Sequence, residues 1–349
     1  MNFSELSQLD QAILATLSYH DLFDMPLTST EIWRYLFREK DGVFAMEQLC
    51  LLPRVVVSFD GRTQRSSPTF AETNVALKQL VKKNILIFCW GYYAVPGRNA
   101  TIEARQRRHA SAQIKWRRLR IIAWFLQAIP FLEMVAASGS LAREMTREGS
   151  DLDVLLVTRP GRIWNVRFVT TVALDFFHLR RRPTGPTDNL ICLNHYLAHD
   201  ALSLSYQSLY TALEYARVVP LFGEKICAEF RLANKDWIGK YLVQLLSDKV
   251  SHHKTVRHSK TLHAIKRLGE VILGGRMGDS LEKWLGAQQK RRISKNEDAN
   301  LSGGRVIASS RHLEFHPHSK EAPLIKQYNA RIAQLGFAAF GDQKDSGLK

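Results

Sequence analysis

Hydrophobic positions recur at helical spacing in the first hundred residues, and a short hairpin pattern follows them. The predicted helices cover residues 6–19, 31–38 and 71–83. Thr28 and Glu31 stand three positions apart, ahead of the second stretch, which is the spacing of a capping box. Two apolar runs flank Trp90 and Gly91 and predict two strands joined by a tight turn; they are residues 85–89 and 92–95.

Three helices followed by a hairpin is the order of a winged helix-turn-helix. We therefore expect residues 1–98 to form such a domain, with an insert at 41–67 between the second and third helices. DNA binding would use the third helix and the wing, and that helix offers Lys78, Lys82 and Lys83. The alternative is a winged helix that serves as a packing or protein-contact module, because a fold does not carry its function with it.

A second pattern over residues 131–158 alternates buried runs with turns. The predicted elements are a strand at 134–138, a turn at Gly139–Ser140, a helix at 141–147 and a strand at 151–158. On that second strand, Asp151 and Asp153 are separated by one apolar residue, so their side chains project from the same face.

This arrangement of residue types suits metal-assisted phosphate chemistry. Two carboxylates that converge on one point, Asp151 and Asp153, can hold Mg²⁺ or Mn²⁺, which prefer oxygen ligands and keep phosphate as a partner. Gly139 lacks a Cβ and would let a triphosphate approach the backbone. Ser140 offers a hydroxyl and an N–H near a predicted helix start, where anions are favoured.

The motif Gly139–Ser140, a ten-residue gap and Asp151-Leu152-Asp153-Val154 resembles the signature of the nucleotidyltransferase superfamily of the DNA polymerase beta type. Ser138, before the glycine, departs from the usual apolar residue. The layout is also similar to a bacterial group in which a winged helix precedes such a domain. The resemblance implies transfer of a nucleoside monophosphate from a nucleoside triphosphate to a hydroxyl acceptor, which is a protein side chain, a small metabolite or an RNA end.

The third carboxylate that the superfamily usually places on a later strand is missing. The matching strand, residues 190–196, contains Asn194 where an acid is expected. His195 could serve as a base, and Asp188 and Asp200 flank the strand. Two alternatives to a transferase therefore stay open: a DNA-binding regulator whose degenerate transferase domain senses a nucleotide, and a toxin-like or self-modifying enzyme with a partner protein.

The remaining chain is divided by its charge and apolar spacing. We expect a nucleotidyltransferase core at 99–200 that begins with a basic helix at 101–127, either a path for a phosphate backbone or a solvated connection between domains. A mostly helical region should cover 201–349, with a mobile linker at 288–305 and a disordered tail. Apolar spacing also predicts helices at 164–177 and 261–273. His312, His316 and His318 lie close in sequence, but we expect no metal site there for want of a suitably spaced acid.

Composition narrows the class of partner. The 349 residues carry 49 Lys and Arg against 33 Asp and Glu, a net charge of +16, which favours anionic partners. The predicted fold class is α+β, with a winged helix, a central α/β sheet domain and an α-helical C-terminal region. The four cysteines contain no CxxC pair and are expected to be free thiols, and the absence of a signal peptide or membrane span predicts a cytoplasmic protein.

Overall fold

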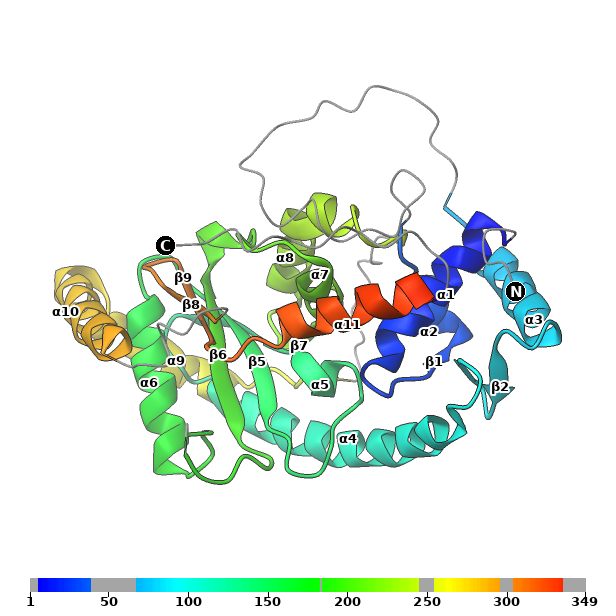
Figure 1. Ribbon diagram of the computed structural model, residues 1–349. Helices are drawn as coiled ribbons and strands as arrows, with labels where there is room; N and C mark the ends of the chain where they lie inside the picture. Colours follow the sequence, from blue (N-terminus) through cyan, green and yellow to red (C-terminus); the bar gives the residue numbers. More distant parts are fainter. Residues whose placement is uncertain (1–5, 39–66, 183, 245–253, 296–303, 335–349) are drawn as a thin grey trace, which may run out of the picture.

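The computed structural model describes residues 6–38, 67–182, 184–244, 254–295 and 304–334 (Figure 1). These residues form an α+β fold, as predicted, with one small and one large sheet. In the described ranges, no helix is long and apolar enough to cross a membrane.

The N-terminal unit contains the three helices and the hairpin that the sequence predicts. Its elements are α1 (Gln8–Asp21), β1 (Leu27–Thr28), α2 (Ser29–Arg34), α3 (Phe70–Lys82), β2 (Ile87–Cys89) and β3 (Tyr92–Ala94). The strands form an antiparallel sheet in the order β1-β3-β2. Thr28 and Glu31 make the predicted capping box. Trp90 and Gly91 both have positive φ, the backbone of a tight hairpin turn. Of the expected insert at 41–67, only the last position lies within the described residues.

The large sheet has six strands in the order β7-β4-β5-β6-β9-β8. The strands are β4 (Leu132–Ala137), β5 (Leu152–Thr158), β6 (Ile191–Ala198), β7 (Val219–Phe222), β8 (Arg305–Ala308) and β9 (His312–His316). β5 and β6 are parallel, and the other neighbours are antiparallel. Residues of β4, β5 and β6 are mostly apolar on both faces and almost fully buried, since helices cover both sides of these strands.

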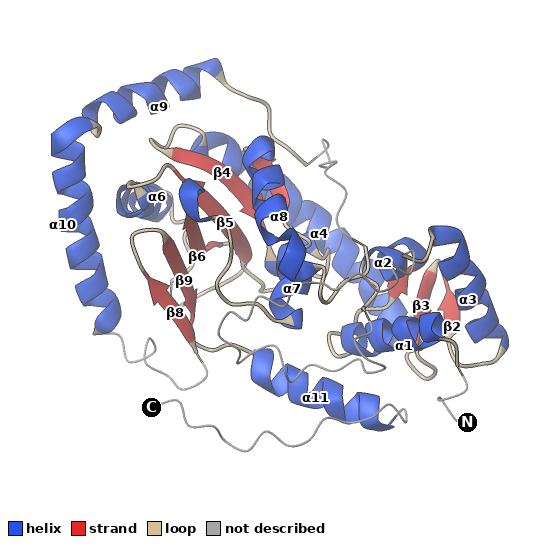
Figure 2. Cartoon of the chain, turned by 90° about the horizontal axis from the view of Figure 1, so that it is seen from above, coloured by secondary structure: helices blue, strands red, loops and turns tan. Residues whose placement is uncertain are grey.

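The helices around this sheet fall into two layers. They are α4 (Asn99–Leu126), α5 (Gly139–Ala142), α6 (Ile163–Phe176), α7 (Leu209–Tyr215), α8 (Glu224–Ile238), α9 (Lys260–Ile272), α10 (Gly275–Ser294) and α11 (Glu321–Gln334). On one face, α4 and α6 pack against Leu152, Val154 and Leu156. On the other face, Leu155 and Val157 belong to an apolar core that also contains residues of α7, α8 and α11. Figure 2 shows α10 outside α6, so α6 lies between α10 and the sheet.

The basic helix α4 runs beneath both the N-terminal unit and the large sheet (Figure 1). Several of its cations make internal contacts: buried Arg105 pairs with Glu31 of α2 at 2.7 Å, and buried Lys115 pairs with Asp188 at 2.8 Å. The exposed cations of this helix are Arg107, Arg117, Arg118 and Arg120. Some of the positive charges of this helix are thus used in ion pairs with other elements, and only the remaining ones are exposed to solvent or to a ligand.

Two expectations for the C-terminal half need correction. The region after residue 201 is rich in helix, but it also supplies β7, β8 and β9 to the large sheet. The linker expected at 288–305 is wrong for its first part, because α10 continues to Ser294, and wrong at Arg305, where β8 begins. α10 is held by packing that lies far away in sequence: Gly286 lies against the Trp164 ring, where a Cβ would meet the ring at 2.9 Å. The expected tail, which follows Gly341, lies outside the described residues.

Candidate functional site

The residues of the Gly-Ser and Asp-x-Asp motif gather at one end of β5, where it meets β4 and β6. Asp151 immediately precedes β5, Asp153 lies within it, and Cys192 is the register partner of Asp153 on β6. A carboxylate oxygen from each aspartate and the Cys192 thiol lie within 4.8 Å of one another. The two carboxylates therefore lie close together as predicted, although Asp151 precedes β5 rather than lying on it.

Gly139 joins the two halves of the motif. Its φ is +61°, and a Cβ at this position would lie 2.3 Å from Oδ2 of Asp153. The Ser138 N–H also donates to the Asp153 carbonyl at 3.0 Å. The missing Cβ thus makes room for the Asp153 carboxylate itself, in addition to any ligand. Any side chain here would be strained and would push that carboxylate away.

Ser140 lies beside this contact, half-buried in the first turn of α5. The predicted helix at 141–147 is shorter in the structure, since α5 ends at Ala142. A helix of four residues has little macrodipole, so the anion-binding capacity expected of Ser140 rests on its own hydroxyl and N–H.

The electrostatics of the aspartate pair favour a cation. The pKa of Asp153 is raised to about 7, first by burial and then by the negative charges of Asp151 and Glu214, against the opposing charges of Arg143 and Arg181. Burial and the two aspartates also raise the pKa of the Cys192 thiol to about 12, so this thiol is neutral at physiological pH. A divalent cation would relieve the repulsion between the two carboxylates.

Two arginines stand beside the pair. Arg181 Nη1 lies 3.1 Å from Asp151 Oδ2 and 3.5 Å from Cys192 Sγ. Arg143 donates from Nε to the Gly139 carbonyl at 3.2 Å. Arg181 belongs to a basic cluster at 180–182, in the segment that leads toward β6 and Asn194. Arg159, which follows the aspartate strand, pairs instead with Glu133 and Glu270 and is thus engaged elsewhere.

The described part of β6 carries no acid, as the sequence shows. Asn194 takes the expected place: its Nδ2 donates to Asp153 Oδ1 at 3.0 Å, and its buried Oδ1 has no hydrogen-bond partner among the described residues. Asp188 and Asp200 do not reach in, because they pair with Lys115 and Arg311. The additional acid that acts on Asp153 is Glu214 of α7, a residue in a helical stretch that nothing in the sequence links to the motif.

A cavity of about 170 Å³ lies close to α5. Its wall includes Arg143 and Glu144 after α5, Glu31 and Arg34 of α2, and the buried Arg217. Because Arg143 also acts on Asp153 through its charge, this cavity adjoins the surroundings of the aspartate pair.

These residues fit a hard divalent cation. The two aspartates supply oxygen ligands that lie close together, and the neighbouring Cys192 thiol is neutral. The Asn194 side chain contacts Asp153 through its Nδ2, and its amide oxygen, which has no hydrogen-bond partner among the described residues, is a further oxygen donor. Oxygen donors of this kind are those that Mg²⁺ and Mn²⁺ take in proteins.

His195 belongs to a different cluster. It is buried, and its ring contacts His312 of β9 and Tyr215 of α7 rather than the aspartates. The expectation that the C-terminal histidines lack a suitably spaced acid is wrong, because Glu314 stands between His312 and His316 and contacts both. The sequence contains this alternation, His-x-Glu-x-His, which becomes meaningful once residues 312–316 form a strand.

No protein-family model matches this chain, and searches of curated proteins and of solved structures found no significant match to it.

Proposed function

We propose that the chain is a nucleotidyltransferase that uses Mg²⁺ or Mn²⁺ to move a nucleoside monophosphate from a nucleoside triphosphate onto a hydroxyl acceptor. The observation that carries this proposal is the contact between Gly139 and Asp153. It brings a Gly-Ser turn next to an Asp-x-Asp strand, so that a triphosphate at the turn and a metal ion at the two aspartates would be neighbours, as metal-assisted phosphoryl transfer needs.

Asp151 and Asp153 would hold the cation, which would supply charge stabilisation for the triphosphate. Gly139 and Ser140 would receive the triphosphate. Arg181 and Arg143, which flank the aspartates, would contact phosphate oxygens. The acceptor oxygen forms a bond to the α-phosphorus while the bond to pyrophosphate breaks, and pyrophosphate leaves. Glu214 is the candidate group to take the proton of the acceptor hydroxyl.

A nucleotide-sensing regulator that binds DNA is the second candidate, and two observations favour it. Asn194 occupies the place of the third carboxylate, and a neutral amide cannot accept a proton. The N-terminal unit has the element order of a winged helix, and Lys78, Lys82 and Lys83 at the end of α3 are exposed. In this alternative the aspartate pair binds a nucleotide, and the N-terminal unit reads duplex DNA.

Transfer of label tests the enzymatic proposal. The protein is incubated with Mg²⁺ and each triphosphate labelled at the α-phosphate, with cell lysate, RNA or small hydroxyl compounds as acceptors. We expect label in one acceptor class and release of pyrophosphate. Asp151→Asn/Asp153→Asn should abolish both, and Glu214→Gln should slow transfer. Asp200→Asn is the matched control, because Asp200 pairs with the exposed Arg311. Absence of label and of pyrophosphate with every triphosphate would refute transfer.

DNA binding is measured separately, as affinity against salt concentration. The regulator proposal predicts a linear fall of log K with log salt, and a slope reduced by about 0.9 for each lysine–phosphate contact that is removed. Replacing Lys78, Lys82 and Lys83 by Gln should therefore flatten the slope. Undetectable duplex binding at low salt would refute this second candidate.

A further inference from the structure

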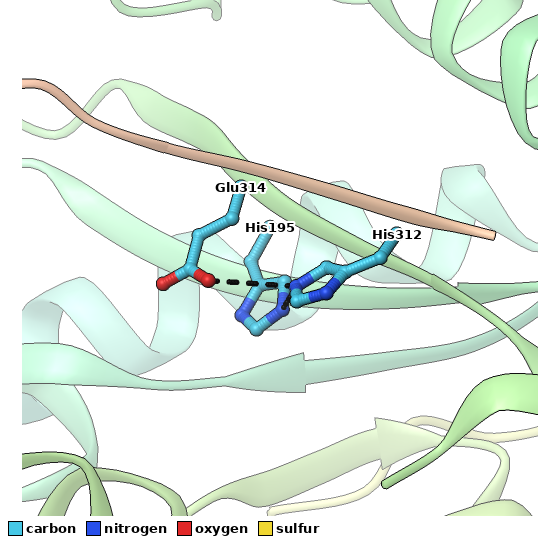
Figure 3. Close-up of side chains that lie close together, drawn as sticks. All are labelled: His195, His312 and Glu314. Carbon is cyan, nitrogen blue, oxygen red and sulfur yellow. Dashed lines mark hydrogen bonds and ion pairs between the residues drawn. The ribbon is translucent and has the colours of Figure 1, made fainter. Parts of the chain in front are cut away.

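A second group of metal-ligand side chains lies on the large sheet, away from the aspartate pair. His195 of β6 is the register partner of Glu314 on β9, and His312, Glu314 and His316 alternate along β9. Alternate residues of a strand project from the same face, so these side chains converge across two neighbouring strands. Figure 3 shows the rings of His195 and His312 close together and the Glu314 carboxylate beside them.

The ligand atoms are close enough for one ion. Nε2 of His195 lies 3.0 Å from Nε2 of His312, which lies 3.4 Å from Oε2 of Glu314. One ligand atom from each of the three residues falls within 4.8 Å of the others. His195 and Glu314 are each only 2% exposed, so the cluster is inside the protein rather than on a solvated surface.

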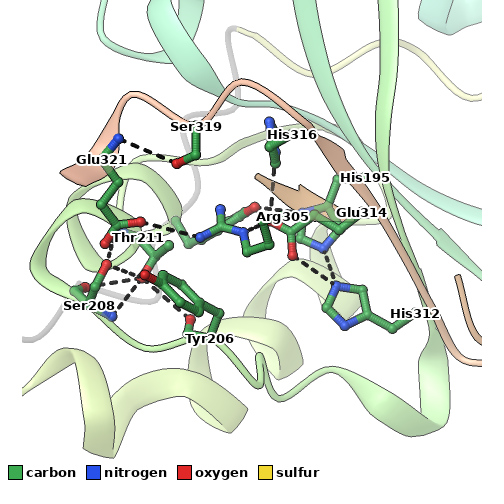
Figure 4. Close-up of polar contacts among 11 residues, drawn as sticks. His195, Tyr206, Ser208, Thr211, Arg305, His312, Glu314, His316, Ser319 and Glu321 are labelled. Atoms are coloured by element: carbon green, nitrogen blue, oxygen red, sulfur yellow. Dashed lines mark hydrogen bonds and ion pairs between the residues drawn. The ribbon is translucent and has the colours of Figure 1, made fainter. Parts of the chain in front are cut away.

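The neighbours of this cluster orient its ligand atoms. The Tyr215 hydroxyl of α7 lies 2.6 Å from Nδ1 of His195. Arg305 Nε donates to Oε1 of Glu314 at 2.5 Å, and Figure 4 shows this pair beside His195 and His312. A His195 ring that donates from Nδ1 to Tyr215 keeps the Nε2 lone pair free for a ligand. Arg305 occupies one carboxylate oxygen of Glu314 and leaves Oε2 directed at the imidazoles. Outer partners of this kind fix the tautomer and orientation of metal ligands.

The charge states of His195 and Glu314 are compatible with metal binding at the geometry described above. Burial lowers the pKa of His195 to about 3, so its imidazole is neutral. Burial alone would raise the pKa of Glu314, but the hydrogen bond to His312 and the charge of Arg305 bring it down to about 2. Neutral imidazole and ionised carboxylate are the ligating forms.

We propose that His195, His312 and Glu314 form a binding site for a transition-metal ion, with Zn²⁺ as the first choice. Two imidazole nitrogens and one carboxylate oxygen suit Zn²⁺ better than Mg²⁺, which prefers oxygen donors alone. The ion would join β6 to β9 and so fix the C-terminal strands on the sheet. This proposal is independent of nucleotide transfer, because the aspartate pair does not take part.

Zinc binding is tested in an Asp151→Asn/Asp153→Asn background, which removes the aspartate cluster with metal-ligand geometry. The protein is stripped with a chelator, dialysed and titrated with Zn²⁺, and bound Co²⁺ is followed separately by its visible absorption. We expect one equivalent of Zn²⁺ and a cobalt spectrum typical of four-coordinate ions. His312→Gln and Glu314→Gln should weaken binding roughly 100-fold or more, and Tyr215→Phe about 10-fold to 100-fold.

His199→Gln is the matched control. His199 also lies between two carboxylates, those of Glu133 and Glu229, but outside the cluster. It should bind zinc as the parent does. Circular dichroism and the unfolding midpoint without metal show whether each variant is folded, and added Zn²⁺ should raise the midpoint of the parent and of His199→Gln. Failure of the folded parent to bind Zn²⁺, or equal affinity in His312→Gln and the parent, would overturn the proposal and leave a hydrogen-bonded histidine pair.

Discussion

Gly139 shows how one residue can decide the geometry of the candidate site. Its φ lies in the left-handed region, and the space of its missing Cβ holds the Asp153 carboxylate. Burial and the charge of Asp151 raise the pKa of Asp153 to about 7. The position of the Asp153 carboxylate on β5 therefore depends on a glycine at position 139, where α5 begins after β4.

Replacement of Gly139 by alanine tests this dependence. The left-handed backbone alone costs a non-glycine residue about 1–2 kcal/mol, and the added Cβ must also displace Asp153. We expect Gly139→Ala to lower the free energy of unfolding and to abolish Mg²⁺-dependent nucleotide binding. Gly149→Ala is the control, since Gly149 has φ +80° and an added Cβ would meet nothing within 4 Å. It should lose stability but keep binding; equal loss of binding in both variants would contradict the account.

His20 of α1 is a second residue whose surroundings set its chemistry. Its Nδ1 donates to the Thr16 carbonyl at 2.8 Å, and its Nε2 accepts from the Arg217 guanidinium at 2.7 Å. Burial, followed by the charge of Arg217, lowers the pKa of His20 well below 6.5. A proton on Nε2 would remove the acceptor for Arg217 and place two positive charges together.

The stability of the protein should therefore depend on pH through His20. Below about pH 6.5, His20 is protonated in the unfolded chain and stays neutral in the folded chain. The free energy of unfolding therefore falls as pH decreases, by up to about 1.4 kcal/mol per pH unit for this group. Urea unfolding of the wild type and of His20→Gln between pH 7.5 and pH 5 measures this. The variant should show a shallower pH dependence, and parallel curves for the two proteins would contradict the prediction.

At the scale of elements, α6 and α10 depend on each other. The first backbone N–H groups of α6 have no partner within their own helix, and Glu282 of α10 accepts from two of them, those of Trp164 and Asn165, at 2.9 and 2.8 Å. Burial raises the pKa of Glu282, whereas these hydrogen bonds lower it. The carboxylate thus acts as a cap for the N-terminus of a helix that lies 118 positions away in sequence.

Removal of this cap should cost stability. Glu282→Ala leaves two buried N–H groups without an acceptor, and we expect a loss of about 1–3 kcal/mol in the free energy of unfolding. The neighbouring Lys283→Ala on the exposed side of α10 should change it by less than about 0.5 kcal/mol. Denaturant unfolding measures both, and similar values for the two variants would show that the cap contributes nothing.

This element also shows what sequence patterns can and cannot predict. The strand predicted at 151–158 and the helices α1, α3, α6 and α9 follow from local periodicity, which predicts them within a few residues, and α4 is predicted from its run of basic residues. The polar residues in the last turns of α10 predict a linker instead of a helix. Local patterns do not show that this helix is held by contacts distant in sequence, those of Glu282 and Gly286 with Trp164. Strands β8 and β9 are short and form only by pairing with each other and with β6.

The candidate site divides in the same way. Asp151, Asp153 and Gly139 are predictable, because their spacing within one motif places them together. Glu214 and Cys192 come to the site from α7 and β6, and their part in it depends on tertiary packing and register. The cluster of His195, His312 and Glu314 escapes sequence reasoning because two of its residues lie on a strand that local patterns do not predict.

At the scale of the whole molecule, the N-terminal unit and one face of the large sheet share a continuous core. The cluster includes residues of α1, α3, α7, α8 and α11 together with Leu155 and Val157 of β5. Tyr328 of α11 is fully buried, and its ring lies 5.5 Å from that of Tyr19 in α1 and 6.2 Å from that of Phe37. We therefore expect the two parts to unfold together.

Tyr328→Ala tests this cooperativity. Deleting a buried aromatic ring costs about 3–5 kcal/mol, and a shared core predicts that the whole calorimetric transition moves to lower temperature as one peak. Gln327→Ala, at the adjacent exposed position, should leave the transition almost unchanged. Two separate transitions, of which only one moves in Tyr328→Ala, would show that the N-terminal unit and the sheet unfold independently.

The transferase and the nucleotide sensor both need a site for a metal-bound triphosphate, and we propose that Asp151, Asp153 and Gly139 build it. Isothermal titration with non-hydrolysable triphosphates, with Mg²⁺ and with excess chelator, tests it most directly, because binding is required of both the transferase and the nucleotide sensor. We predict one triphosphate per chain in the presence of Mg²⁺, at least ~100-fold weaker binding in Asp151→Asn/Asp153→Asn, and unchanged binding in Asp200→Asn. Binding that is independent of Mg²⁺, or equal in the wild type and the double variant, would show that the two aspartates do not form a metal–triphosphate site.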